Sequence, residues 1–258
     1  FTNVVIARLP VELEEPNEWG ELWDTREWGE VFGGHSRCDH CDTQVRNVDN
    51  IPVISWLLLR GKCRSCGAPI SAFHPFVELV VPALALAALA VIGWNWRLPP
   101  VWWLIPVGVA VTVIDFRTLI VPTRLVWPAF WVSAGLTVLG ALAMGEPFWL
   151  LGAVIGAVAF AGPLFVIWFI HPRGMGFGDV RLAVLLGWTL GYSFASLGDD
   201  RWVIPLFGAL IAITISALVG IVLGLALVGF QRKHIPFGPA LIAGTLITIA
   251  LAEPIHSW

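Results

Sequence analysis

The sequence predicts an all-α polytopic membrane protein, a bundle of about seven to eight transmembrane helices with a small polar domain before it. Three observations support this prediction. Of the 258 residues, 57% are apolar and only 13% are charged, whereas soluble domains have about 25% charged residues. Eleven of the 18 acidic residues precede residue 50, and long apolar runs fill the chain after residue 75. All four cysteines lie in the polar part.

Composition divides the chain into three parts. Residues 1–7 are apolar but too short to span a bilayer, which takes about 20 residues, so we interpret them as the remnant of a first transmembrane helix. Residues 8–75 form the polar domain, and its acidic first half, residues 10–30, predicts an amphipathic surface helix because its tryptophans recur at near-helical spacing. Residues 76–258 form the transmembrane domain.

Seven apolar runs follow the polar domain. Several are near the length of a membrane-spanning helix, and most lack internal charge. Tryptophans gather at the ends of several runs, as they do at membrane–water interfaces. The runs cover residues 76–93, 101–115, 125–144, 148–170, 179–195, 202–229 and 236–252.

Lys and Arg are divided unequally between the two predicted sides of the bundle. One set of alternating segments holds 13 of the 15 basic residues, and the other set holds two. Cytoplasmic segments carry such an excess, so we expect the basic set, the polar domain included, to face the cytoplasm. The basic set comprises residues 8–75, 116–125, 171–182 and 230–235.

The four cysteines form two CxxC pairs, Cys38 with Cys41 and Cys63 with Cys66, separated by 21 residues. Two such pairs supply the four thiolates of a tetrahedral structural zinc site. Disulfides and redox chemistry are the alternatives, but the cytoplasm is reducing, and two matched pairs on one polar domain favour zinc. His40 could substitute as a ligand. A closed four-thiolate site stabilises a fold and has no open position for catalysis.

Two carboxylates lie at the ends of apolar runs. Asp115 ends one run, and Asp179 opens another after the glycine-rich residues 174–178. Charges near a bilayer are costly and mark functional sites. If the two helices meet, one carboxylate can activate water while the other, protonated, polarises a carbonyl. The glycines permit close approach and unusual dihedral angles. The plainer alternatives are an N-cap at Asp179 and an ion pair of Asp115 with Arg117.

Two further features have two interpretations each. Glu78 near the start of a run could cap its helix or bind a cationic group beside the polar domain. Residues 234–239 contain two prolines and could be a simple helix start or a broken helix entry that lines a cavity. The net charge of −3 and the lack of a large basic patch argue against nucleic acid as a partner.

Taken in their order along the chain, these motifs resemble those of the type IV prepilin peptidases, which belong to the GxGD class of aspartyl membrane proteases. The resemblance covers essentially the whole chain, and the ordered set of motifs is specific where a lone GxGD would be weak. The segments that carry it are residues 3–10, 36–41, 49–57, 60–67, 76–79, 115 with 120–122, 176–182 and 235–240.

The resemblance implies an aspartic endopeptidase of the bacterial inner membrane that serves type IV pili or type II secretion. Its partners would be the lipid bilayer and prepilins or pseudopilins, whose basic leader it removes after a glycine at the cytoplasmic face. It also implies N-methylation of the new terminus with S-adenosylmethionine. The resemblance assigns catalysis to Asp115 and Asp179, the shape of the site to Gly176 and Gly178, zinc binding to the four cysteines, and methyl transfer, more loosely, to Glu78.

The sequence departs from the family pattern at two places. Thr123 stands where the family often has Asp, so we expect that any role of that side chain is lost. The acidic stretch 12–30 is longer and more negative than expected, and it either recruits the basic leader or is a solvated face. One alternative function is a peptidase that only cleaves, like the preflagellin peptidases, against which the cysteine loop argues. Another is an ion or metal transporter, which would place acids in mid-helix.

Overall fold

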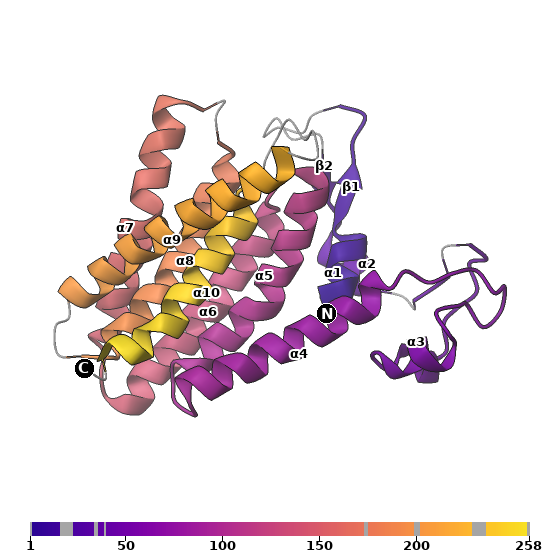
Figure 1. The fold of residues 1–258 in the computed structure, drawn as a ribbon, viewed down its shortest axis with the longest axis horizontal. Coiled ribbons are helices and arrows are strands. Elements are labelled where there is room, and N and C mark those ends of the chain that lie inside the picture. Colours follow the sequence, from indigo (N-terminus) through magenta and orange to yellow (C-terminus); the bar gives the residue numbers. More distant parts are fainter. Residues whose placement is uncertain are drawn as a thin grey trace.

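The computed structural model describes residues 2–15, 23–33, 36–38, 40–172, 175–198, 202–228 and 236–256 (Figure 1). In this part of the chain, the bundle consists of long helices, and the shorter elements precede it. The long helices are α4 (Phe73–Ile92), α5 (Leu98–Thr118), α6 (Thr123–Met144), α7 (Trp149–Ile170), α8 (Phe177–Ala195), α9 (Val203–Val228) and α10 (Gly238–His256). The shorter elements are α1 (Thr2–Arg8), β1 (Pro10–Glu12), β2 (Trp23–Thr25), α2 (Trp28–Phe32), the 3-10 helix η1 (Asn47–Asn50) and α3 (Ile54–Leu58).

The predicted helical membrane fold is confirmed. Five described helices, α4, α5, α6, α7 and α9, are long and apolar enough to cross a bilayer. Each of the seven predicted runs corresponds to one long helix, although α5 begins three residues before its predicted start because Pro99 and Pro100 fit the first turn of a helix. The small α1 packs against α4 and α5.

Helix α8 is the central element of the bundle. It contacts α6, α7, α9 and α10, and 13 of its 19 residues are buried. Its contact with α7 brings two backbones together through glycines, Gly152 and Gly156 on α7 against Gly187 and Gly191 on α8. A Cβ at Gly156, Gly187 or Gly191 would overlap the facing backbone, and one at Gly152 would overlap Ala195 Cβ. This is the small-residue packing that membrane helices use.

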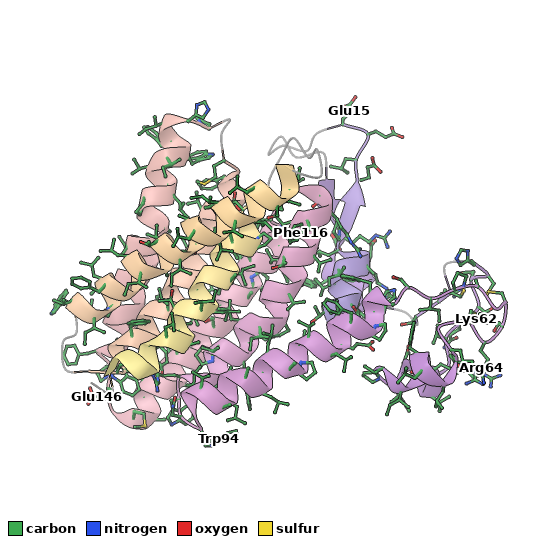
Figure 2. All side chains as sticks on the ribbon, viewed as in Figure 1. Glu15, Lys62, Arg64, Trp94, Phe116 and Glu146 are labelled. Carbon is green, nitrogen blue, oxygen red and sulfur yellow. The ribbon has the colours of Figure 1, made fainter. Side chains whose placement is uncertain are left out.

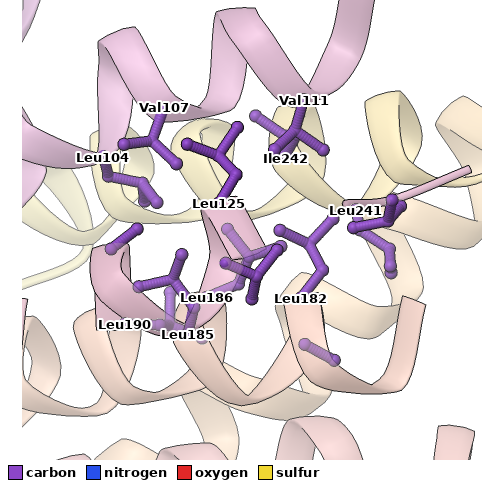
Figure 3. Close-up of a cluster of buried hydrophobic side chains, with 14 of the residues drawn as sticks. Leu104, Val107, Val111, Leu125, Leu182, Leu185, Leu186, Leu190, Leu241 and Ile242 are labelled. Carbon is purple, nitrogen blue, oxygen red and sulfur yellow. The ribbon is translucent and has the colours of Figure 1, made fainter. Parts of the chain in front are cut away.

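The apolar core joins α8 to three helices that contribute to the site described below. Figure 3 shows leucine and valine side chains of α5, α6 and α10 directed toward the leucines of α8. Burial of this cluster fixes the ends of the four helices relative to one another. Its labelled members are Leu104, Val107, Val111, Leu125, Leu182, Leu185, Leu186, Leu190, Leu241 and Ile242.

The predicted amphipathic helix over residues 10–30 is wrong. Strands β1 and β2 pair antiparallel there, and of the described residues 10–15 and 23–30 only those of α2 are helical. The sequence between the strands contains Pro16 and Gly20, which disfavour a helix, and the recurring tryptophans do not override them. The cysteine-containing segment follows and projects from the bundle beside the start of α4 (Figure 1).

The two ends of the bundle are distinct. Helix direction alternates, so the end of α5 lies at the same end as the starts of α6, α8 and α10 (Figure 1). Figure 2 places Trp94 and Glu146 at the opposite end from Glu15. The first end therefore brings together the helix termini that carry Asp115 and Asp179.

Candidate active site

Asp115 lies in the last turn of α5, with only 3% of its surface exposed. The helix ends where Leu119 adopts the left-handed conformation, and the N–H of Leu119 donates to the carbonyl oxygen of Asp115. The guanidinium of Arg117 lies 5.0 Å from the centre of the Phe73 ring, and no ion pair joins Arg117 to Asp115 among the described residues. The plain ion-pair interpretation of Asp115 is therefore not supported.

Gly238, the first residue of α10, holds the side chain of Asp115. Its N–H donates to Asp115 Oδ2 at 2.9 Å. A helix N-terminus has unpaired N–H groups and a partial positive charge, so it is a good partner for a carboxylate. A Cβ at position 238 would lie 2.8 Å from Asp115 Oδ2, which is why glycine is needed. Sequence reasoning missed this contact, although a glycine followed by Pro239 at a helix start was a usable signal.

Of the two interpretations of residues 234–239, the structure supports a simple helix start. Helix α10 begins at Gly238 with Pro239 in its first turn, where a missing N–H does no harm. Residues 234 and 235 of the motif lie outside the described part of the chain.

Asp179 lies in the first turn of α8. The N-cap of that helix is Gly176, so the interpretation of Asp179 as an ordinary N-cap is wrong. Gly178 provides close approach, because a Cβ there would come 2.9 Å from Val121 Cβ. The expected unusual dihedral angles are absent at both glycines, since Gly176 has φ −69° and neither has positive φ.

Val121 is the residue around which the site is assembled. It lies in the short connection between α5 and α6 and is 5% exposed. It packs against Gly178 at the start of α8, and a Cβ on Gly238 at the start of α10 would lie 3.5 Å from its Cγ2. The connection between α5 and α6 and the starts of α8 and α10 thus meet at this valine.

The two acids lie at the same end of the bundle. Gly238, which binds Asp115, and Gly178, which precedes Asp179, both lie beside Val121. The surroundings of the two carboxylates differ, because Asp115 is buried and accepts the hydrogen bond of Gly238, whereas Asp179 is partly exposed. The joint action of the two carboxylates on one water molecule stays a prediction.

Thr123 has a contact that the sequence did not predict. Arg181, two residues after Asp179, donates a hydrogen bond to the Thr123 hydroxyl. The guanidinium of Arg181 also lies 4.6 Å from the centre of the Phe177 ring, which packs on Trp168. The hydroxyl of Thr123 therefore links the start of α6 to the start of α8, and the loss of the role that Asp has at this position in the family stays a prediction.

Glu78 connects three segments that are distant in sequence. Its Oε1 accepts from Asn3 Nδ2 of α1 at 3.2 Å, and its Oε2 accepts from the backbone N–H of Val53 at 2.9 Å. Val53 has φ 60° and ψ −48°. The Ile54 N–H donates to the Pro52 carbonyl oxygen, so Val53 is the central residue of a γ-turn. Positive φ is a strained conformation for a β-branched residue. Glu78 therefore holds the strained turn that leads into α3.

The four predicted cysteines come together. Their Sγ atoms all lie within 4.8 Å of one another, and those of Cys38 and Cys66 are 3.8 Å apart. Zn–S bonds of about 2.3 Å in a tetrahedron place neighbouring sulfurs about 3.8 Å apart, so the donor set fits zinc. His40 is not part of the cluster.

The two CxxC segments have the same backbone geometry. In the first, Asp42 donates its N–H to Cys38 O; in the second, Gly67 donates to Cys63 O, both at 2.9 Å. Asp42 and Gly67 both have positive φ, which glycine adopts freely and Asp tolerates. Two hydrogen bonds with Thr43 lower the pKa of the Cys41 thiol to about 6; the one with the Thr43 hydroxyl has the larger effect and the one with its backbone the smaller. A thiolate is the form that binds metal.

An ion pair fixes the second CxxC segment. Arg64 lies between its cysteines and donates from Nε and Nη2 to the two carboxylate oxygens of Asp49, at 2.9 and 2.6 Å. Hydrogen bonding to Arg64 lowers the pKa of Asp49. Paired donors of this kind fix geometry as well as adding energy, so η1 is joined to the cysteine cluster. Sequence reasoning did not identify this pair.

The fold and the site define a polytopic α-helical membrane protein in which two aspartates lie at one end of the bundle and four cysteines gather on a segment beside it (Figure 1). Comparisons with known proteins place the chain in a family. Residues 1–92 match the bacterial peptidase A24 N-terminal domain, and residues 101–227 match the type IV leader peptidase family. The chain belongs to the type IV leader peptidase family, as the ordered motifs predicted.

Similar proteins align over nearly the whole chain. A prepilin leader peptidase/N-methyltransferase of Aeromonas hydrophila is 33% identical, with 100% of this chain and 88% of that protein aligned. Proteins with the same description from Stutzerimonas stutzeri and Neisseria gonorrhoeae are 35% and 31% identical, covering 95% and 97% of this chain and 84% and 86% of their own lengths. A search of solved structures found no match.

Proposed function

We propose that this chain is an aspartic endopeptidase of the bacterial inner membrane that removes the basic leader of type IV prepilins or pseudopilins after a glycine. We propose further that it methylates the new N-terminus with S-adenosylmethionine. Family membership supports both activities. The observation that carries the peptidase mechanism is that Asp115 and Asp179 lie at the same end of the bundle (Figure 1), with Gly238, which binds Asp115, and Gly178, which precedes Asp179, both beside Val121.

The carboxylate pair would share one proton, because two adjacent carboxylates resist being charged together. The ionised carboxylate takes a proton from water as its oxygen attacks the scissile carbonyl. The protonated carboxyl donates a hydrogen bond to the carbonyl oxygen. The tetrahedral intermediate collapses when the C–N bond breaks and the leaving amine takes a proton from the pair. The Gly238 N–H would hold Asp115 in a fixed orientation through these steps.

The site would face the cytoplasm. The helix termini around Val121 belong to the segments that hold 13 of the 15 Lys and Arg residues, and such segments stay on the cytoplasmic side. A prepilin leader in the cytoplasm would meet the acids at this surface. We propose that residues 1–7 belong to a first membrane helix, that residues 8–75 form the cytoplasmic domain, and that residues 76–258 form the protease domain.

The four cysteines would hold structural zinc. Bound zinc would supply a cross-link between the two CxxC segments rather than catalysis, because a four-thiolate shell has no open position. Cys38 and Cys41 would provide one half of the shell, and Cys63 and Cys66 the other. The Asp49–Arg64 ion pair would keep the second half in place.

Glu78 is the proposed methyl-transfer residue, and its surroundings would orient it. Its two oxygens accept from Asn3 and Val53. Asn3 Oδ1 is buried beside Glu78 and has no hydrogen-bond partner among the described residues. An amine to be methylated needs acceptors of this kind. S-adenosylmethionine would supply the methyl group.

The assignment is tested by cleavage of a prepilin in membranes that contain Asp115→Asn or Asp179→Asn. Each variant should lose cleavage by at least about a thousandfold, because neither the water nor the carbonyl would be activated. Glu146→Gln, at the opposite end of the bundle, is the control (Figure 2). Near-normal cleavage by either Asp variant would refute the proposed mechanism, and mass spectrometry of the product would show whether its N-terminus is methylated.

A further inference from the structure

A groove lies between α2 and the start of α6. It has a volume of about 590 Å³. Its walls include Glu27, the N-cap residue of α2, with Trp28 and Gly29 of α2, and Thr123, Arg124 and Trp127 of α6. The proposed peptidase mechanism uses none of these six residues, so the groove needs its own explanation.

The α6 wall of the groove is connected to the helix that carries Asp179. Thr123 accepts a hydrogen bond from Arg181, which lies two residues after Asp179 on α8. Two residues before Thr123, Val121 packs against Gly178, next to Asp179. A peptide that lay in the groove would therefore contact Thr123, which is linked to the start of α8, where Asp179 lies.

The walls suit a basic peptide. Trp28 and Trp127 give the groove an aromatic surface, on which the aliphatic part of Lys or Arg can pack and a cationic head can interact with the ring. Glu27 adds an exposed carboxylate to the α2 wall, and it has no ion-pair partner in the described ranges. Arg124 is the opposing charge on the α6 wall, so a cationic head is attracted to the α2 side.

The α2 wall is held in a fixed place. Arg8 Nη1, at the end of α1, donates to Val31 O and Gly33 O at 3.2 Å each. Trp28 and Phe32 stack with their ring centres 5.2 Å apart. A wall that is already ordered loses little entropy when a peptide binds.

We propose that this groove binds the basic segment that precedes the scissile bond of the substrate, with Glu27 as the residue that selects positive charge. This inference rests on the proposed peptidase function and names where its substrate is recognised. The acidic residues that the sequence contains before residue 31 thus have a use beyond solubility, at least at Glu27.

The test uses the full chain in detergent micelles and two synthetic peptides. Both carry the same Gly–Phe junction and apolar segment; one has two lysines before the junction, and the other has glutamines there. Glu27→Gln should raise KM for the lysine peptide about 1.5- to 5-fold, the size expected for an exposed charge pair, with kcat unchanged and no effect on the glutamine peptide. Glu27→Lys should raise KM for the lysine peptide further. Glu14→Gln, another exposed acid, is the control.

A second variant tests occupancy of the groove without changing charge. Gly29 lines the groove, and a Cβ there meets nothing within 4 Å, so Gly29→Phe places a ring in the groove and starts it in open space. It should raise KM for both peptides about tenfold or more. Gly135→Phe, where a Cβ on α6 also meets open space, is the matched control and should leave KM unchanged.

The outcomes separate this inference from the proposed function. If the folded wild-type chain cleaves neither peptide, the proposed function fails. If it cleaves them but Glu27→Gln changes KM equally for both or for neither, charge selection by the groove is refuted. Unchanged KM in Gly29→Phe would show that the substrate does not enter the groove, as expected if lipid fills it.

Discussion

Replacement of Gly238 by alanine tests how the site holds Asp115. The structure leaves no room for the added methyl group, which would lie 2.8 Å from Asp115 Oδ2 and 3.5 Å from Val121 Cγ2. Either the carboxylate or the start of α10 has to move, and the 2.9 Å hydrogen bond from the Gly238 N–H is lost or lengthened. A hydrogen bond to a charged group contributes about 1.5–3 kcal/mol.

That energy sets the size of the expected effect. If the hydrogen bond acts mainly in the transition state, its loss should lower kcat/KM about 10- to 150-fold, since about 1.4 kcal/mol corresponds to a factor of ten. The assay is cleavage of a prepilin peptide by the full chain in micelles, with thermal unfolding measured in parallel. Gly135→Ala, which places its methyl group in open space on α6, is the control and should keep full activity.

One result would refute the reasoning. If Gly238→Ala kept wild-type kcat/KM and wild-type thermal stability, then neither the close approach nor the hydrogen bond would matter for Asp115. A loss of activity that came with a large loss of stability would instead point to the packing of α10 as the cause. The ratio of the two effects therefore distinguishes orientation of the carboxylate from general support of the fold.

The remaining predictions concern three other parts of the chain. Gly187→Leu should prevent α7 and α8 from packing and abolish folded protein in membranes, whereas Gly162→Leu, where a Cβ on α7 meets open space, should be tolerated; equal expression of both would contradict the packing. Arg64→Gln should speed the transfer of zinc to a chromogenic chelator about threefold or more, because the ion pair with Asp49 is lost, while Arg60→Gln should not; equal rates would count against the ion pair. Glu78→Gln should raise protease sensitivity near Val53, because a neutral amide is a weaker acceptor for that N–H; unchanged digestion would mean that the turn holds without the carboxylate.

The sequence could predict the parts of this protein that depend on local pattern. Runs of apolar residues near 20 in length predicted the long helices, and the CxxC spacing predicted the cysteine cluster. The balance of Lys and Arg between alternating segments predicted that Asp115 and Asp179 lie at the same end of the bundle. These predictions succeed because membrane span length and metal-ligand spacing are properties of short segments.

The rest required contacts between distant segments. Gly238 is 123 residues from Asp115, and Arg181 is 58 residues from Thr123, so no local pattern connects them. The sequence shows that Thr123 lacks the carboxylate that is common in the family, but it does not show that the Thr123 hydroxyl accepts a hydrogen bond from Arg181. The strands within residues 10–30 are hidden by aromatic residues at near-helical spacing, although Pro16 and Gly20 argue against a helix there.

The glycine contact between α7 and α8 restricts how the site can move. A shift of α8 along its axis by one residue would turn it by about 100° and present a larger side chain to Gly152 and Gly156. Helix α8 therefore has a single permitted register on α7, and gradual sliding is blocked by backbone contact. Any motion that repositions Asp179 has to carry both helices as one rigid unit, so substrate entry must be accommodated by the neighbouring helices instead.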